Sequence, residues 1–201
     1  MRMNRLGFWA MNNPTRAFIQ RRYLLPAFCR IGGPLNGCRV LEVGCGRGAG
    51  LALLRQAGAD RADGIDLDPG MARLTRRTAR TAVLVAVADI AALPMPADSY
   101  DVVVDFGAIH LMPDWQAGIG EVARVLRPGG RFLFEQPAHP LYRRLMPLAT
   151  GRRIPGGFGR AAFLAELEHH GLRLTGLARP GLLTFTGMLG DLVGVAVAPG
   201  G

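Results

Sequence analysis

Short apolar runs alternate with amphipathic segments along most of the chain. The runs typical of buried strands lie at residues 39–43, 61–66, 83–88, 100–106, 131–135, 172–177 and 192–198. Helical patterns lie at residues 15–31, 50–57, 69–81, 115–126 and 160–170. This alternation predicts an α/β fold, with a Rossmann-like, seven-stranded, mainly parallel sheet and helices on both faces, in a single domain. Ligands of such sheets bind beyond the carboxyl ends of the strands.

A glycine-rich turn follows the first strand and precedes a helix. Gly44, Gly46 and Gly48 allow the backbone to turn sharply and allow a ligand to approach the N–H groups of the helix start. Taken alone, the turn also fits a dinucleotide-binding fingerprint, or a tight turn that binds nothing.

Acidic residues near the strand ends narrow the choice of ligand. Asp66 ends the second strand, 20 positions after Gly46, which is near the spacing of a carboxylate that binds ribose hydroxyls. Asp89 follows the third strand, where a carboxylate can meet an adenine amino group. Glu42 lies just before the turn, where it would repel a pyrophosphate and favour a cationic amino-acid group. The acids therefore favour S-adenosylmethionine over NAD.

Several segments, in the right order, resemble the motifs of a known family. Residues 40–48 (VLEVGCGRG) resemble motif I of the class I methyltransferases, and residues 64–69 (GIDLDP) resemble their second motif. The later motifs are similar to residues 88–94, 99–103, 109–114 and 125–131. Between Arg39 and Glu135 the chain thus resembles the class I S-adenosylmethionine-dependent methyltransferases, and in particular the broad small-molecule subgroup called methyltransferase type 11.

The resemblance implies a site for S-adenosylmethionine and its product S-adenosylhomocysteine. The loop would wrap the methionine part, Glu42 would meet its amino group, and Asp66 would accept from the ribose. Adenine would pack on hydrophobic side chains, and residues at the end of the third strand would contact its polar edge. The end of the fourth strand would lie near the sulfonium. The residues expected to bind the cofactor are Glu42, Gly44, Cys45, Gly46, Gly48, Asp66, Leu67, Met71, Asp89, Ile90, Asp105 and Phe106. For Met71 a helix-core role is the alternative, and for Cys45 the role of a small filler.

Methyl transfer needs a general base only when the acceptor must lose a proton. The candidates follow the fourth and fifth strands, on the ligand side of the sheet: His110, His139 and Tyr142. A structural role for His110 and an exposed loop position for His139 are the alternatives. His169 and His170 end a helix, where we expect them only to support its C-terminus.

The charge of the chain is uneven. The formal net charge is +9, and apart from histidine every basic residue is arginine, which is the usage of a GC-rich genome and says little about partners. No acidic residue precedes Glu42, and none lies between residues 136 and 165. We predict an N-terminal helical flap at 1–38 over the acceptor site, a methyltransferase domain at 39–201, and an acceptor-side flap at 136–159. The candidate substrate-binding residues are Arg21, Tyr23 and Arg143.

These flaps also carry apolar and aromatic residues, so the expected acceptor is a small, partly hydrophobic molecule that can carry an acidic group. A solvated basic face is the simplest alternative, followed by attachment to a membrane or RNA. The chain shows no appended RNA-binding module, so nucleic acid is not the expected partner. A regulatory or non-methyltransferase role for the cofactor-binding fold is the main functional alternative.

The three cysteines lack the paired spacing of disulfide frameworks and zinc sites, and no metal is expected. Glycines and Asp191 interrupt the longest apolar stretch, at 181–199, which disfavours a transmembrane segment. The N-terminal segment lacks the apolar core of a secretory signal. A cytoplasmic location is the expectation.

Overall fold

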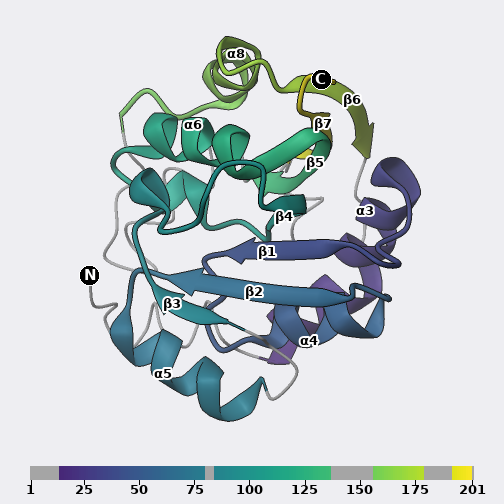
Figure 1. The fold of residues 1–201 in the computed structure, drawn as a ribbon, viewed down its shortest axis with the longest axis vertical. Helices are drawn as coiled ribbons and strands as arrows, with labels where there is room; N and C mark the ends of the chain where they lie inside the picture. The colour runs from purple at the N-terminus through teal and green to yellow at the C-terminus, as the bar shows by residue number, and fades with distance from the viewer. Residues whose placement is uncertain (1–13, 80–83, 137–155, 179–191, 201) are drawn as a thin grey trace.

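Seven strands form one sheet in the order β3-β2-β1-β4-β5-β7-β6 (Figure 1). The computed structural model describes residues 14–79, 84–136, 156–178 and 192–200. The first five strands pair in parallel, and β7 runs antiparallel to both β5 and β6. Their bounds are β1 Arg39–Val43, β2 Arg61–Asp66, β3 Val85–Val87, β4 Tyr100–Asp105, β5 Leu126–Gln136, β6 Arg173–Ala178 and β7 Leu192–Val197. The predicted seven-stranded, mainly parallel sheet is confirmed.

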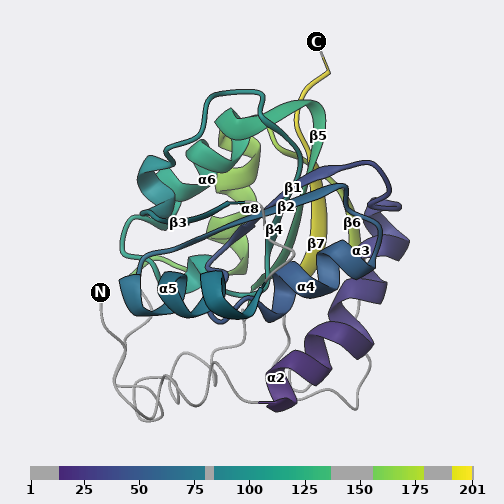
Figure 2. The same cartoon turned by 60° about the horizontal axis from the view of Figure 1, so that its bottom comes forward.

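Helices cover both faces of this sheet, as the alternating pattern predicted (Figure 2). One face carries α3 (Leu25–Gly32), α4 (Ala49–Gln56) and α5 (Pro69–Thr78), and the other carries α6 (Trp115–Val125) and α8 (Arg160–His169). Each face has its own apolar cluster, because the central strands send alternate side chains to opposite sides. Leu41 packs toward α6, whereas its neighbour Val40 packs toward the α3–α5 layer.

The predicted helix at 15–31 is a helical stretch with an irregular middle. It consists of α2 (Pro14–Ile19), a π-helical segment η1 (Gln20–Leu24) and α3. A π turn contains one more residue than an α turn, which rotates the following side chains, and such turns are frequent at functional sites. Here the first π residue, Gln20, is buried rather than exposed.

Other element boundaries differ from the sequence prediction by a few residues. The helix predicted to reach residue 81 ends at Thr78, and its start is capped by Asp68, whose carboxylate accepts from the Gly70 N–H at 2.7 Å. Strand β5 begins at Leu126 rather than residue 131, because Leu126 pairs with Tyr100 before an irregularity in the β4–β5 register. Short 3₁₀ turns, η2 (Ile90–Ala92) and η3 (Ile109–Leu111), follow β3 and β4.

Within the described ranges, the helices are all too short or too polar to span a membrane.

The contact between α3 and β5 provides a test of the packing. Leu133 of β5 is fully buried, and a Cβ placed on Gly32 of α3 would lie 2.5 Å from its side chain. Replacing Leu133 with Ala is expected to lower the free energy of unfolding by about 2–5 kcal/mol, since it leaves a cavity in this close-packed layer. The same change at Leu174, which is 37% exposed on β6, is expected to cost less than about 1 kcal/mol. Urea denaturation of both variants measures the difference, and equal losses would contradict this packing.

Candidate functional site

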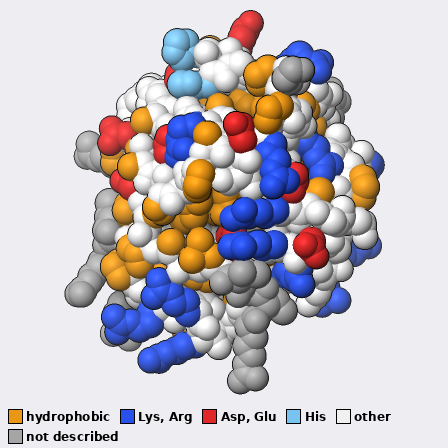
Figure 3. All heavy atoms as spheres, in the orientation of Figure 1, with side chains coloured by type: hydrophobic (Ala, Val, Ile, Leu, Met, Phe, Trp, Pro, Cys, Tyr) orange, Lys and Arg blue, Asp and Glu red, His pale blue; other side chains and the backbone are white. Residues whose placement is uncertain are grey.

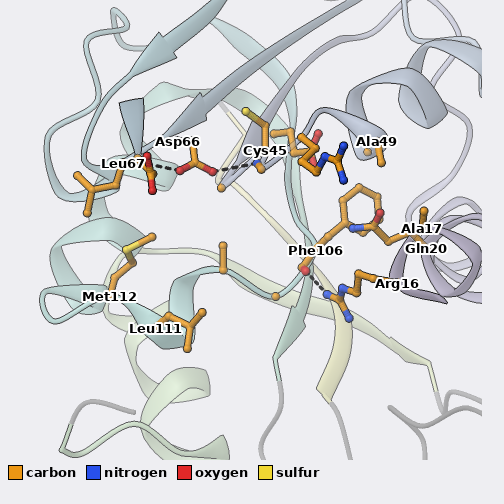
Figure 4. A pocket seen from close by; sticks show the side chains of 18 of the residues that line it. Arg16, Ala17, Gln20, Cys45, Ala49, Asp66, Leu67, Phe106, Leu111 and Met112 are labelled. Atoms are coloured by element: carbon orange, nitrogen blue, oxygen red, sulfur yellow. Dashed lines mark hydrogen bonds between the residues drawn. The ribbon is translucent and has the colours of Figure 1, made fainter. Parts of the chain in front are cut away.

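A cavity of about 330 Å³ lies beyond the carboxyl ends of β1, β2 and β4, facing α2 and η1 (Figure 4). Its size falls within the range of small-molecule sites, roughly 300–1,000 Å³. Its walls combine the glycine-rich loop, the β2 and β4 ends and the N-terminal helix: Pro14, Arg16, Ala17, Gln20, Glu42, Gly44, Cys45, Gly46, Arg47, Ala49, Gly50, Asp66, Leu67, Asp68, Phe106, Gly107, Ala108, Leu111 and Met112.

Asp66 holds the glycine-rich loop in place. One of its carboxylate oxygens accepts from the Gly46 N–H at 2.9 Å, and the other accepts from the Asp68 N–H at 2.8 Å. The loop is held from the other side by α5, because the Thr75 hydroxyl donates to the Gly46 carbonyl. Gly44 adopts a φ of +71°, and a Cβ there would collide with Ala108, so only glycine fits. The loop is therefore preorganised beside a carboxylate that also faces the cavity.

Glu42 is a buried acid in the cavity wall, only 3% exposed. Its Oε2 atom has no hydrogen-bond partner among the described residues. Burial raises the pKa of Glu42 well above its usual 4.5, and the nearby carboxylates of Asp66 and Asp105 raise it further, whereas an N–H of Leu51 opposes the shift. A Cβ on Gly50 would overlap the Glu42 carboxylate, so the first turn of α4 leaves room for it. A buried acid of this kind is the arrangement that a cationic ligand group would stabilise.

Cys45 also lines the cavity, but its thiol is not activated. Burial is the largest cause of a strongly raised pKa, and the carboxylates of Glu42 and Asp66 add to it. The thiolate is the nucleophilic form, so a neutral thiol here fills space rather than reacting. Its backbone N–H donates to the Ile65 carbonyl at 2.9 Å, which ties the loop to β2.

Arg16 of α2 enters the cavity from the side opposite the glycine loop. Its Nη2 atom lies 2.6 Å from Oε2 of the buried Glu135, and it also donates to the Phe106 carbonyl at the end of β4. The N-terminal helix is thus fastened to the ends of β4 and β5 by an ion pair that is only partly exposed to water. Gln20 lies one turn further along, and both residues line the cavity.

Asp105, Gln136 and His110 form a buried polar group behind the cavity wall. The Asp105 carboxylate accepts from the Ala108 N–H at 2.6 Å and from the Gln136 side chain, but burial prevails and raises the pKa of Asp105 to about 7. Burial also lowers the pKa of His110 to about 3, and the positive charge of Arg16 adds to this shift. His110 is 1% exposed, packs 6.1 Å from the Phe158 ring and is not part of the cavity lining. A neutral imidazole of such low basicity is a weak general base.

The structure brings part of the predicted cofactor set together around the cavity: Glu42, Gly44, Cys45, Gly46, Asp66, Leu67 and Phe106. The others lie behind or beside the wall. Gly48 packs against α5, Met71 is buried in α5, and Asp89 caps η2 by accepting from the Ala91 N–H at 3.0 Å. Ile90 belongs to the core under α6, and Asp105 is buried.

Of the predicted acceptor residues, Arg21 is exposed and Tyr23 is half-buried on η1, and neither lines the cavity. The Tyr23 ring packs edge-on against Phe18, 6.2 Å away. His139, Tyr142 and Arg143 lie outside the described residues.

Sequence reasoning missed Arg16 and Gln20 as site residues, although their spacing of four places them on one helix face. It also missed Asp68, Leu111 and Met112, which neighbour the recognised motifs. Their positions depend on how η3 and the N-terminal helix pack, which no local pattern specifies.

Comparisons with known proteins agree with this geometry. The family described as "Methyltransferase domain" matches residues 41–134, from β1 to β5. The chain is 40% identical over 110 residues to a fatty-acid O-methyltransferase of Mycolicibacterium smegmatis, a match that covers 54% of this chain and 40% of that protein. It is 37% identical over 102 residues to a phthiotriol/phenolphthiotriol dimycocerosates methyltransferase of Mycobacterium leprae, covering 50% of this chain and 38% of the relative. The matched part of the chain thus spans about two fifths of these relatives.

A chain of a solved Haloferax volcanii complex between a methyltransferase activator and a methyltransferase has a similar fold. The TM-score is 0.80 at 22% identity, with 99% of both chains covered. Residues 41–134 thus match the methyltransferase domain family, and the strand order and the glycine loop held by Asp66 are the arrangement expected of a class I S-adenosylmethionine-dependent methyltransferase.

Proposed function

We propose that the chain binds S-adenosylmethionine in this cavity and methylates the carboxylate of a lipid-like acceptor. The observation that carries the cofactor part is the buried Glu42 carboxyl in the cavity wall. The ammonium group of the cofactor's methionine would pair with the Glu42 carboxylate, for which Gly50 leaves space. When bound, the cofactor supplies a methyl group on a sulfonium that is a good leaving group.

The residues of the cavity fit the remaining parts of that cofactor. Each Asp66 oxygen accepts one backbone N–H, and since a carboxylate oxygen can accept more than one hydrogen bond, Asp66 could also accept from a ribose hydroxyl. Leu67, Leu111 and Met112 offer apolar surface for adenine. A role of Asp89 and Ile90 in reading the adenine edge stays a prediction, since both lie outside the cavity lining.

The proposal of a lipid-like acceptor is based on the cavity wall opposite the glycine-rich loop. Phe106, Ala108 and Ala17 are apolar, and Arg16 places one guanidinium among them. Such a wall suits a hydrophobic chain with an acidic head. The relatives named above are a fatty-acid and a phthiotriol dimycocerosates methyltransferase, which supports a lipid-like acceptor. In this proposal the N-terminal helix is the flap over the acceptor site, fastened through Arg16 to Glu135.

A carboxylate acceptor also fits the weak basicity of the buried His110 imidazole. It is already ionised at neutral pH, so no proton has to be removed before methylation. The task of the chain is then to orient the acceptor and to exclude water. His110, with a pKa of about 3, is proposed to support the β4 end rather than to act as a base.

The proposed ribose contact can be tested at Asp66. Asp66→Asn is expected to weaken S-adenosylmethionine binding about 10–100-fold, since it removes charge-assisted hydrogen bonds and loosens the hold on Gly46. Asp60→Asn, an exposed acid at the other end of β2, is the matched control and is expected to bind like the wild type. Calorimetric titration measures both, and an unchanged affinity for Asp66→Asn would remove Asp66 from the site.

Glu42 should show opposite effects on stability and on binding. The folded chain holds the Glu42 proton to a higher pH than the unfolded chain does, so this group's contribution to stability is complete below its usual pKa and is lost as pH rises. Glu42→Gln, which keeps the size and removes the charge, is expected to match the wild type near pH 4 and to be more stable near pH 8. The same variant is expected to bind S-adenosylmethionine at least about tenfold more weakly.

Urea denaturation of the free protein at both pH values measures the first effect, and calorimetry measures the second. A variant that is less stable than the wild type at the higher pH would show that the Glu42 charge is satisfied within the chain.

The acceptor can be tested by release of S-adenosylhomocysteine with oleate as acceptor and methyl oleate as control. The chain is expected to methylate oleate and not its ester, which has no free carboxylate. The double change Arg16→Gln with Glu135→Gln, which avoids a lone buried charge, is expected to raise the KM for oleate about tenfold without changing cofactor affinity. Arg21→Gln is the control on the exposed side of the same helical stretch, and is expected to leave the KM unchanged.

If only Arg21→Gln raises the KM for oleate, the acceptor binds on the outer face of η1 and not in the cavity. Cofactor binding without turnover of any lipid acid would instead favour the non-methyltransferase role.

A further inference from the structure

The last turn of α8 gathers three metal-ligating side chains at a distance from the cofactor cavity. Glu166, His169 and His170 each offer one ligand atom, and these atoms all lie within 4.8 Å of one another. In Figure 3, the pale blue histidine side chains stand at the top of the face, over the place of α8 in Figure 1. The spacing i, i+3, i+4 directs all three side chains to one face of the helix.

We propose that Glu166, His169 and His170 form a site for a divalent transition-metal ion such as Zn²⁺. Two imidazoles and one carboxylate are a donor set that zinc accepts, with metal–ligand distances of about 2.0–2.2 Å. Ligand atoms around such an ion are separated by about 3.3 Å, so small side-chain rotations suffice here. Nε2 of His170 and Oε1 of Glu166 are already 3.1 Å apart.

Independently of the cluster, the neighbouring helix α6 leaves a space at Gly120 in which the His170 ring lies, called here the seat of the ring. A Cβ on Gly120 would lie 2.8 Å from Cε1 of His170 and 3.2 Å from its Nε2 atom. Gly120 lies inside α6, where glycine destabilises the helix relative to alanine. The imidazole therefore occupies the space that the missing side chain leaves, and its orientation is restricted by a second helix.

The rest of α8 makes the site rigid. Phe163 and Leu167 anchor the helix in the core, and the Phe163 ring packs 5.0 Å from Phe134 of β5. The backbone N–H of His170 donates to the backbone carbonyl of Glu166 at 3.2 Å, which fixes the two residues one helical turn apart. Ligands on an anchored helix lose little freedom when a metal binds.

This inference departs from the expectation of no metal, which rested on the spacing of the cysteines. The histidine pair was interpreted there as support for the helix end. The alternative role for the same residues is an i,i+4 ion pair between Glu166 and protonated His170. Zn²⁺ binds the deprotonated forms of imidazole and carboxylate ligands, so binding is expected to weaken in acid.

The test is calorimetric titration of the untagged full chain with ZnCl₂ at neutral pH. The wild type is expected to bind one Zn²⁺ at micromolar concentration, and His170→Ala and Glu166→Gln to bind at least about tenfold more weakly. Glu168→Gln, on the same helix but outside the cluster, is the matched control and is expected to bind like the wild type. Two possible ligands outside the cluster, the half-buried thiol of Cys38 and the imidazole of His139, are controlled by Cys38→Ser and His139→Ala, which should also retain binding.

Gly120→Ala keeps every ligand but fills the seat of the His170 ring, and is expected to weaken Zn²⁺ binding about tenfold while the chain stays folded. The proposal is overturned if the wild type binds no Zn²⁺ at about 100 μM, or if His170→Ala binds like the wild type. It is also overturned if the binding is lost in Cys38→Ser or His139→Ala instead. Full affinity in Gly120→Ala would contradict the seated geometry.

Discussion

A carboxyl group buried in the first strand, that of Glu42, is the constraint around which the site is arranged. It is 3% exposed, its pKa is raised by burial, and two further carboxylates stand close enough to raise it more. The chain makes room for it with Gly50. A single domain has only about 5–15 kcal/mol of net stability, so an uncompensated acid is retained for a reason other than folding. A cationic ligand group in the cavity would provide that reason.

The two walls of the cavity have different chemistry because different parts of the chain build them. The glycine loop and β2 present backbone N–H groups and Asp66, which suits the polar cofactor. The N-terminal helix and the β4 end present apolar side chains and the Arg16–Glu135 pair, which suits an amphiphilic acceptor. The methyl group would pass between them, and the ion pair fixes the helix that forms the acceptor wall.

The sequence predicted the sheet well, and seven of the twelve residues predicted to bind the cofactor line the cavity, because both depend on local patterns. Buried parallel strands are continuous apolar runs, and loops at strand ends inherit their position from the sheet. The cavity wall that the N-terminal helix forms was not predicted. Arg16 lines the cavity because it pairs with Glu135 of β5 and donates to the Phe106 carbonyl, whereas the pattern of charges favoured Arg21. Likewise, the seat of His170 depends on Gly120, fifty residues earlier in the chain.

The most direct test of the central claim is the proton balance of cofactor binding. Calorimetry of S-adenosylmethionine binding near neutral pH, in buffers of different ionisation enthalpy, counts the protons released. The account predicts proton release from Glu42 in the wild type, because the cofactor's ammonium group would favour the ionised carboxylate, and a smaller release in Glu42→Gln. Equal proton release in both proteins would contradict the pairing of Glu42 with the cofactor.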